Sequence, residues 1–265
     1  MSIVSGCDVG SLTSKSVIMK DRKIIKSCVI KSRPNPKDSA DTVMGEALES
    51  AGLSLNDIEY CIGTGYGQEK ISFVNESISE ITCHCKGARW MLPSVGTVID
   101  IGGQDCKTMK IDRDGNIVKF MANDKCASGT GRFLDVMAAL LDLDISEIGG
   151  LTRRSKSPVT LTSTCTVWAQ ADVIKYVNSG VPIEDIGAGI NTAMAQRVAI
   201  LVNAVKPEGD MLMTGGVSKN IGVVSTLEKL IGRKIKKTRK ADPQIAGALG
   251  AALIALERTE NGGKK

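Results

Sequence analysis

Residues 97–105, TVIDIGGQD, have the pattern of a buried strand that ends in an aspartate and continues into a glycine turn. Residues 3–15, IVSGCDVGSLTSK, repeat this order with an apolar run, Asp8 and a turn of glycine and hydroxyl residues. Asp8 and Asp100 are offset by 92 positions, and each is followed by two further strands separated by a polar turn. The offset predicts an internal duplication of one supersecondary unit.

The rest of the chain alternates helical and strand patterns. Helices are expected at 39–51, 80–92, 186–205, 221–231 and 245–257, and further strands at 57–63 and 210–214. A turn is expected at 10–15, and a loop at 32–38. We therefore predict an α/β protein of two related lobes, the first formed by 1–92 plus 244–265 and the second by 93–243.

The composition excludes several classes of protein. Of 265 residues, 42% are apolar, and 34 basic side chains stand against 29 acidic ones. This excess of five positive charges is too small to argue for nucleic-acid binding, and the basic run at 233–240 is either a solvated edge or a partner patch. No signal pattern and no membrane-spanning apolar stretch is visible. The eight cysteines therefore indicate reduced thiols in a cytoplasm, and they favour an anaerobic setting.

Three glycine-containing turns have the composition of phosphate-binding loops. Residues 8–15 combine Asp8 with glycine, hydroxyl residues and Lys15; residues 100–105 offer a second such turn, and residues 213–218 a strand-to-helix turn. Backbone N–H groups and hydroxyls in such turns can cradle a phosphate group. Each turn alone is ordinary, and none has the spacing of a P-loop or of G-x-G-x-x-G. Together, around a duplicated hairpin, they are much more specific.

This arrangement resembles the superfamily of acetate and sugar kinases, heat-shock chaperones and actin. The resemblance implies an actin-like ATPase fold with ATP and Mg²⁺ between two lobes. Asp8 and Asp100 would face one another across the cleft and hold the magnesium ion directly or through water; the alternative role of each is a turn-capping aspartate. The implied nucleotide-binding residues are Gly10, Ser11, Leu12, Thr13, Ser14 and Lys15 in the first loop, Gly102 and Gly103 in the second, and Gly215, Gly216, Val217 and Gln244 around the adenosine.

Gln104 bears on the type of reaction. A kinase of this fold needs a base near the phosphoryl acceptor, whereas an ATPase needs a group that orients water. A glutamine amide can orient water without acting as a base. Gln104, beside the second phosphate loop, therefore favours hydrolysis, with catalysis supplied by positioning, Mg²⁺ and backbone N–H groups.

Two cysteines lie where helices are expected to begin. Cys126 precedes an amphipathic run whose N-cap would be Ser128 or Thr130, and Cys165 opens a second helical run. A thiol at the positive end of a helix dipole suits a thiolate or an anionic metal–sulfur cluster. Two thiolates are half of what an iron–sulfur cluster usually needs, so a twofold dimer would supply the rest. The alternative is a pair of ordinary helix-start cysteines.

The other six cysteines have simpler interpretations. Cys7, Cys28, Cys61 and Cys106 lie in or beside apolar strands and are expected in the core. Residues 83–85, Cys-His-Cys, contain the only histidine of the chain. Adjacent residues rarely chelate one metal well, and no second pair stands at zinc-like spacing, so a metal site there is disfavoured.

Four motifs together carry a closer resemblance. They are NDKCASGTGRFLDVMA at 123–138, DIGGQD at 100–105, STCTVWAQ at 163–170 and MTGGVSKN at 213–220. These motifs resemble those of activators of 2-hydroxyacyl-CoA dehydratases, of the ATPase subunits of benzoyl-CoA reductase and of reductases of double-cubane-cluster proteins.

The resemblance implies one 4Fe–4S cluster per homodimer, held by Cys126 and Cys165 of each subunit. It further implies that ATP hydrolysis drives a low-potential electron to a partner iron–sulfur dehydratase or reductase. A ferredoxin or flavodoxin would be the electron donor. Two competitors remain open: a small-molecule kinase of the same fold without iron, and a non-catalytic actin-like assembly protein.

Overall fold

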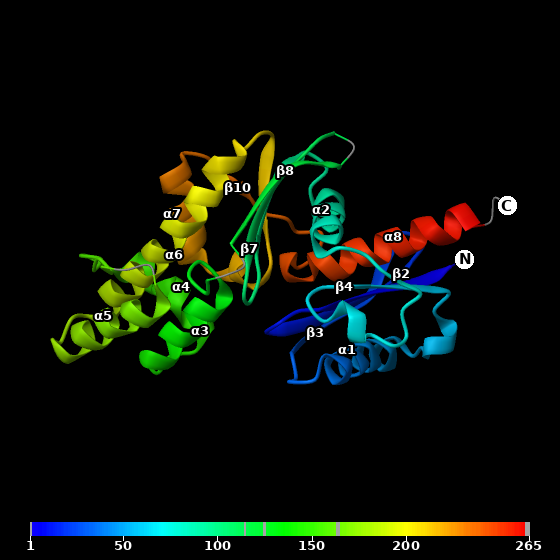
Figure 1. Cartoon of the computed structure of the whole chain (residues 1–265), viewed down its shortest axis with the longest axis horizontal. Coiled ribbons are helices and arrows are strands. Elements are labelled where there is room, and N and C mark those ends of the chain that lie inside the picture. Colours follow the sequence, from blue (N-terminus) through cyan, green and yellow to red (C-terminus); the bar gives the residue numbers. More distant parts are fainter. Residues whose placement is uncertain (1, 114, 124–125, 163–164, 263–265) are drawn as a thin grey trace.

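The computed structural model describes residues 2–113, 115–123, 126–162 and 165–262, and it contains two five-stranded sheets. The first has the order β3-β2-β1-β4-β5, and the second β10-β9-β6-β7-β8 (Figure 1). We call the parts built on these sheets the first lobe and the second lobe. The strands are β1 (Ile3–Val9), β2 (Thr13–Lys20), β3 (Lys23–Lys31), β4 (Tyr60–Thr64), β5 (Glu76–Ser77), β6 (Val95–Ile101), β7 (Cys106–Ile111), β8 (Ile117–Asn123), β9 (Asp210–Thr214) and β10 (Ile235–Lys236).

The two sheets share one plan. β1 pairs antiparallel with β2 and parallel with β4, and β6 pairs in the same way with β7 and β9. The aspartates of the sequence repeat, Asp8 and Asp100, lie in the central strands of the two sheets. Each is the second-to-last residue of its strand. The predicted α/β fold of two related lobes is therefore confirmed. The residues at which one lobe passes into the other stay a prediction.

The described residues form eight α-helices and four short 3₁₀ turns. The helices are α1 (Pro36–Ala51), α2 (Glu80–Met91), α3 (Gly131–Leu140), α4 (Ile145–Arg154), α5 (Thr166–Asn178), α6 (Ile183–Val205), α7 (Ile221–Ile231) and α8 (Ala246–Gly262). The 3₁₀ turns are η1 (Leu55–Asp57), η2 (Gln68–Lys70), η3 (Gly216–Lys219) and η4 (Pro243–Ile245). Within the described ranges, no helix is long and apolar enough to cross a membrane.

Helices α2 and α8 lie in the middle of the molecule (Figure 1). Their apolar side chains form one core with residues of both sheets, such as Val4 in β1 and Val98 in β6. The two helices approach so closely that a Cβ on Gly250 would lie 1.8 Å from the carbonyl oxygen of Cys83. Because both lobes pack on this helix pair, the pair defines how one lobe stands against the other.

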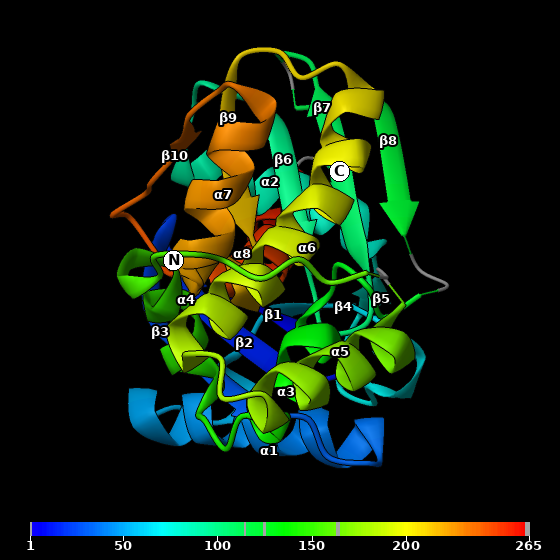
Figure 2. The ribbon, with the colours of Figure 1, turned by 90° about the vertical axis from the view of Figure 1, so that its left-hand side faces the viewer.

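The second lobe carries most of the remaining helices. Its core joins β6, β7 and β9 to α3, α4, α5, α6 and α7. Figure 2 views the molecule from this side and shows α3 and α5 close together, as their packing requires. The first lobe has a smaller outer core between β1, β2 and α1.

Several element boundaries differ from the sequence predictions. The turn expected at 10–15 is shorter, because β2 already begins at Thr13 and pairs Ser14 with Val9 in register. Helix α1 begins at Pro36 within the expected loop, since the Asn35 side chain accepts a hydrogen bond from the amide of Lys37. Proline is well suited to this first helical position, so the predicted start at residue 39 was wrong by three residues.

Candidate active site

A cavity of about 620 Å³ lies between the two lobes. Its lining comes from the turn after β1, the turn after β6, the glycine turn after β9 and the first residues of α3 and α4. The predicted nucleotide-binding and catalytic residues in the lining are Gly10, Ser11, Leu12, Thr13, Lys15, Asp100, Gly102, Gly103, Gln104, Gly215, Gly216, Val217 and Gln244. Segments from the whole length of the chain thus meet at one cavity.

Asp8 lies immediately behind this lining. It stands opposite Lys15 of β2 in register, and the Lys15 Nζ is 3.2 Å from its Oδ2. Asp8 is only 1% exposed, and apart from this ion pair its carboxylate oxygens have no hydrogen-bond partner among the described residues. Burial would lower the pKa of Lys15, but the Asp8 carboxylate raises it above its ordinary value. A buried carboxylate with unused lone pairs fits a hard divalent cation such as Mg²⁺.

Asp100 occupies the matching place in the second lobe but is held differently. Its Oδ1 accepts a hydrogen bond from the Thr214 hydroxyl at 2.9 Å and lies 3.0 Å from His84 Nδ1. Its Oδ2 has no hydrogen-bond partner within the part of the chain described. Burial would raise the pKa of Asp100, but the His84 imidazole beside it holds that pKa well below its usual range.

His84 is a site residue that the sequence analysis missed. It lies on α2, is 4% exposed, and is surrounded by the carboxylates of Asp100 and Glu80. Burial would lower the pKa of His84, but these carboxylates, Asp100 first, raise it above the ordinary histidine value. Lys107 completes the network, with its Nζ 3.1 Å from Glu80 Oε2 and 2.5 Å from Asp105 Oδ2. The only sequence signal was the four-residue spacing of Glu80 and His84 on one helix.

Glycines allow turns to approach other segments closely, at Gly103 between the two lobes and at Gly215 within the second lobe. A Cβ on Gly103 would lie 2.6 Å from Cγ of Leu12 in the opposite lobe. Gly215 has a φ of +81°, and a Cβ there would lie 2.2 Å from the carbonyl oxygen of Ile101. Any larger residue at these two positions would force the turns apart.

The positions of Ser14, Gln104 and Gln244 relative to the cavity differ. Ser14 does not line the cavity, because its side chain is buried and its Oγ lies 2.9 Å from Ser32 Oγ. Gln104 is exposed at the cavity, where its amide is available to a small polar molecule. The Oε1 of Gln244 accepts a hydrogen bond from Lys219 Nζ at 2.7 Å, beside the glycine turn.

The two candidate cluster cysteines lie near the first turns of neighbouring helices. Cys165 is exposed and is the N-cap residue of α5, whereas Cys126 is half-buried and precedes Thr130, the N-cap residue of α3. Thr130 thus occupies the N-cap position as expected, but its hydroxyl donates to the carbonyl of Ala127 and makes no capping hydrogen bond to the helix. Parts of both cysteine motifs, residues 124–125 and 163–164, lie outside the described residues.

The remaining cysteines are structural, with one correction. Cys83 and Cys85 are buried, and burial raises the pKa of each thiol to about 12, so neither is a ready metal ligand. Cys7, Cys61 and Cys106 are buried as expected. Cys28 is not a core residue but half-exposed, because β3 is the outer strand of the first sheet and alternates between exposed and half-buried positions.

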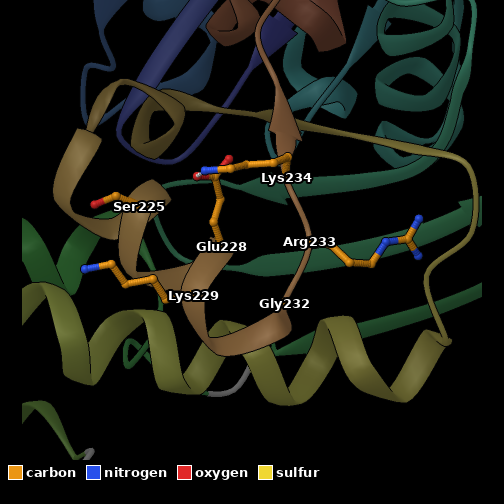
Figure 3. A pocket seen from close by; sticks show the side chains of 6 residues that line it. All are labelled: Ser225, Glu228, Lys229, Gly232, Arg233 and Lys234. Carbon is orange, nitrogen blue, oxygen red and sulfur yellow. Dashed lines mark hydrogen bonds and ion pairs between the residues drawn. The ribbon is translucent and has the colours of Figure 1, made fainter.

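A smaller hollow of about 240 Å³ lies beside α7. Figure 3 shows Lys229 and Arg233 pointing to opposite sides, whereas Lys234 meets Glu228. Lys234 pairs with Glu228 at 2.9 Å, and Arg233 donates to the carbonyls of Pro207 and Gly209. These contacts brace β10 rather than form a binding site, which supports a structural interpretation of this part of the basic run.

Two α/β lobes that enclose a cavity lined by three glycine turns define the actin-like ATPase fold. A glucokinase of the ROK family from Streptomyces griseus shares this fold, with a TM-score of 0.57 over 97% of this chain and all of that one, at 13% identity. The chain belongs to the BadF/BadG/BcrA/BcrD ATPase family, whose sequence profile matches residues 5–255.

Three relatives match this chain over nearly their whole length. The activator of the 2-hydroxyisocaproyl-CoA dehydratase from Clostridium difficile, solved with bound ADPNP, superposes with a TM-score of 0.95 at 40% identity, over 99% of this chain and 97% of that chain. The (R)-2-hydroxyglutaryl-CoA dehydratase activating ATPase of Acidaminococcus fermentans is 42% identical over 97% of this chain and 99% of its own. A benzoyl-CoA reductase subunit from Thauera aromatica is 32% identical, over 98% and 95% respectively.

Proposed function

We propose that this protein uses ATP hydrolysis to deliver a low-potential electron to a partner iron–sulfur enzyme. The electron would leave a 4Fe–4S cluster held by Cys126 and Cys165 from each of two copies of the chain. The observation that carries the proposal is a direct backbone connection between the second phosphate loop and α3, the helix that follows Cys126. The amides of Gly131 and Arg132 donate to the carbonyls of Gly102 and Gly103, each at 2.8 Å.

The cavity supplies what ATP hydrolysis needs. Asp8 and Asp100 would hold Mg²⁺ directly or through its water, and Lys15, beside Asp8, would add a positive charge near the phosphates. The N–H groups of the first and second glycine turns would face the phosphates, and the turn at Gly215 the adenosine. Gln104 would orient the attacking water, whose oxygen bonds to the γ-phosphorus as the bond to the leaving ADP oxygen breaks.

A change at the phosphates has a short path to Cys126. If the second loop moves when the γ-phosphate leaves, the two hydrogen bonds from Gly131 and Arg132 carry α3 with it. Asn123 holds the other side of this segment, since its Nδ2 donates to the carbonyls of Cys126 at 3.2 Å and Ser128 at 2.7 Å. Nucleotide state and the position of Cys126 are therefore mechanically linked.

The donor set fits a cluster shared between two copies of the chain. Helices α3 and α5 pack together; Cys165 is the N-cap residue of α5, and Cys126 lies four residues before the N-cap residue of α3. Beside Cys165, Val167 and Trp168 are 68% and 67% exposed, an apolar surface suited to cover by a second copy of the chain. Two thiols from each copy complete four, and the bound cluster would supply a one-electron store of tunable potential.

The functions of the relatives indicate the kind of partner. Activators of 2-hydroxyacyl-CoA dehydratases and a benzoyl-CoA reductase subunit match this chain end to end. We therefore propose an iron–sulfur dehydratase, benzoyl-CoA reductase or double-cubane-cluster protein as the electron acceptor. A ferredoxin or flavodoxin is the proposed donor.

The decisive experiment counts iron and acid-labile sulfide in protein purified without oxygen. We expect about four of each per dimer, together with a dimeric mass in solution. A protein that stays free of iron after anaerobic reconstitution, yet forms ADP only when a small-molecule acceptor is added, is instead a kinase of the same fold. Iron-free protein with nucleotide-dependent polymers would point to an assembly protein.

A further inference from the structure

The duplicated sheets place two threonines at equivalent positions with different partners. Thr64 of β4 is paired in register with Asp8, and Thr214 of β9 with Asp100. The Thr64 hydroxyl turns away and donates to the carbonyl of Ile78 at 2.8 Å. The Thr214 hydroxyl donates to the Asp100 carboxylate at 2.9 Å. The same position thus serves the protein scaffold in one lobe and the candidate active site in the other.

His84 gives Asp100 a further contact that Asp8 lacks. Its Nδ1 lies 3.0 Å from Asp100 Oδ1 and 3.2 Å from the Thr214 hydroxyl, so three side chains meet at one carboxylate oxygen. The imidazole reaches Asp100 from α2, which packs with α8 between the lobes. A Cβ on Gly247 would lie 2.8 Å from both His84 Nε2 and Asp8 Oδ2, so the other ring nitrogen lies near the first aspartate.

A hydrogen-bond network explains these side chains better than a chelate does. The nearest ligand atoms of Glu80, His84 and Asp100 lie within 4.8 Å of one another, a spacing that a metal ion could span. However, Glu80 is already engaged in an ion pair, since the Lys107 Nζ lies 3.1 Å from its Oε2. His84 Nδ1 is already engaged with Asp100 Oδ1, and one oxygen of that carboxylate, Oδ2, remains without a hydrogen bond among the described residues.

We propose that His84 is a positioning residue that fixes the orientation of the Asp100 carboxylate and so makes the two equivalent aspartates unequal in catalysis. His84 and Thr214 hold Oδ1, which leaves Oδ2 for the metal-bound water or the attacking water. Asp8 has no such imidazole or hydroxyl contact; its one close partner is Lys15, whose Nζ lies 3.2 Å from Oδ2. This inference rests on the proposed ATP hydrolysis in the cavity and adds the residue that positions Asp100 across the two lobes.

Loss of His84 therefore affects turnover rather than nucleotide binding. Without the imidazole, the Asp100 carboxylate can rotate about its side-chain bonds, while the three glycine turns still hold the nucleotide. A misplaced catalytic group costs up to about 100-fold in rate, so we expect His84→Ala to lower kcat for ATP hydrolysis about 10- to 100-fold. KM for Mg–ATP and the affinity for a non-hydrolysable analogue should change less than about threefold, because ground-state contacts remain.

Two conservative variants separate positioning from packing. Asparagine in place of His84 keeps an N–H donor near the position of Nδ1, whereas glutamine places its donor near Nε2. We expect His84→Asn to recover most of kcat and His84→Gln to resemble His84→Ala. Thr214→Val removes the other bond to Asp100 and should also lower kcat. Thr64→Val is the matched control from the duplicated lobe and should leave kcat unchanged.

The measurements are steady-state ATP hydrolysis, analogue binding and the melting temperature of each variant. Equal loss of kcat in the asparagine, glutamine and alanine variants would overturn the proposal, as would a loss that follows melting temperature alone. An unchanged kcat in His84→Ala overturns it as well. A wild-type protein that does not hydrolyse ATP would instead contradict the proposed function itself, so the two failures are distinguishable.

Discussion

Lys15 and Lys107 occupy equivalent positions in the two lobes, each paired in register with the aspartate near the end of the central strand. Their side chains have nevertheless diverged. Lys15 lines the cavity and is 3.2 Å from Asp8, whereas Lys107 is turned to Asp105 and Glu80 and does not line it. The duplication thus supplied two lysines, of which only Lys15 lines the cavity.

This divergence predicts unequal effects on nucleotide affinity. Replacing Lys15 with methionine removes a charge-assisted contact to phosphate, and we expect nucleotide affinity to fall about tenfold or more. Lys107→Met is the matched control and should lower affinity much less. Binding of a fluorescent ATP analogue measures both variants. Equal losses of nucleotide affinity in the two variants would show that both lysines act only through the overall electrostatic potential of the cavity.

Gln104→Ala should slow hydrolysis more than it weakens binding. The exposed amide lies beside the second phosphate loop, so its removal leaves the cradle intact but no longer orients water. We expect kcat to fall about 10- to 100-fold, with analogue affinity nearly unchanged. Phosphate release under saturating Mg–ATP provides the measurement, and an unchanged turnover would remove the role assigned to this residue.

Cys126→Ser and Cys165→Ser should each abolish the cluster while nucleotide binding is largely retained. Neither thiol belongs to the cavity lining, and both stand near the starts of α3 and α5. Iron content after anaerobic reconstitution and analogue affinity are measured on the same samples. Cys28→Ser, a half-exposed cysteine of the first lobe, is the control and should keep full iron. Full iron in either test variant would exclude the shared-ligand proposal.

The crossing of α2 and α8 should tolerate no added methyl group. A Cβ on Gly250 would lie 1.8 Å from a backbone oxygen of α2, which cannot move without displacing the helix. We expect Gly250→Ala to destabilise the fold by about 3 kcal/mol. Gly45 also lies inside a helix but has open space around its Cβ position, so Gly45→Ala should stabilise by about 0.5–1 kcal/mol. Urea unfolding measures the free energy of unfolding of both variants. A change of the same sign in the two variants would contradict this description of the packing.

Asp185 should make stability depend on pH. Its Oδ1 accepts hydrogen bonds from the Ser155 hydroxyl at 2.6 Å and from the amides of Lys156 and Ser157 at 2.9 Å each. The Ser155 hydroxyl, followed by the Ser157 amide, lowers the pKa of Asp185 below its ordinary value. The resulting stabilisation is present above the unfolded-state pKa of about 3.9 and is lost as pH falls through the lower folded-state pKa.

Asp185→Asn tests this dependence. The variant should melt below the wild type at pH 7, and the gap should narrow as pH is lowered from about 5 to 3. Melting curves across this range provide the measurement. A gap that stays constant with pH would mean that Asp185 acts through the shape of its side chain rather than through its charge.

The sequence could predict the fold because the duplication is local and repeated. Each central strand, its aspartate and its following turn lie close together in the chain, so their pattern is visible without tertiary contacts. The start of β2 was harder to predict from the sequence, because Ser14 and Lys15 are polar and belong to the strand only through their pairing with β1. Cys28 was placed in the core because its sequence neighbours are apolar, and no local pattern shows that β3 lies at a sheet edge.

The sequence could predict the turns of the candidate site but not the hydrogen-bond network around His84 and Asp100. Glycines and aspartates at strand ends carry a local signal, and most of those chosen line the cavity. His84 was missed because its partner Asp100 lies in the other lobe, and the contact depends on how α2 crosses the second sheet. The flanking cysteines drew attention to a metal site, yet their side chains belong to the core around α2 and α8.

The C-terminal position of helix α8 affects the order in which the lobes can fold during synthesis. It completes the core shared with β1 and β4, although the whole second lobe lies between them in the chain. The second lobe's own core is built from residues no later than Ile235. Because synthesis proceeds from the N-terminus and domains fold as units, a ribosome-bound chain halted before α8 should present a folded second lobe beside an unfinished first one. Cys126 and Cys165 would thus have a folded setting before the ATP cleft has closed around its first nucleotide.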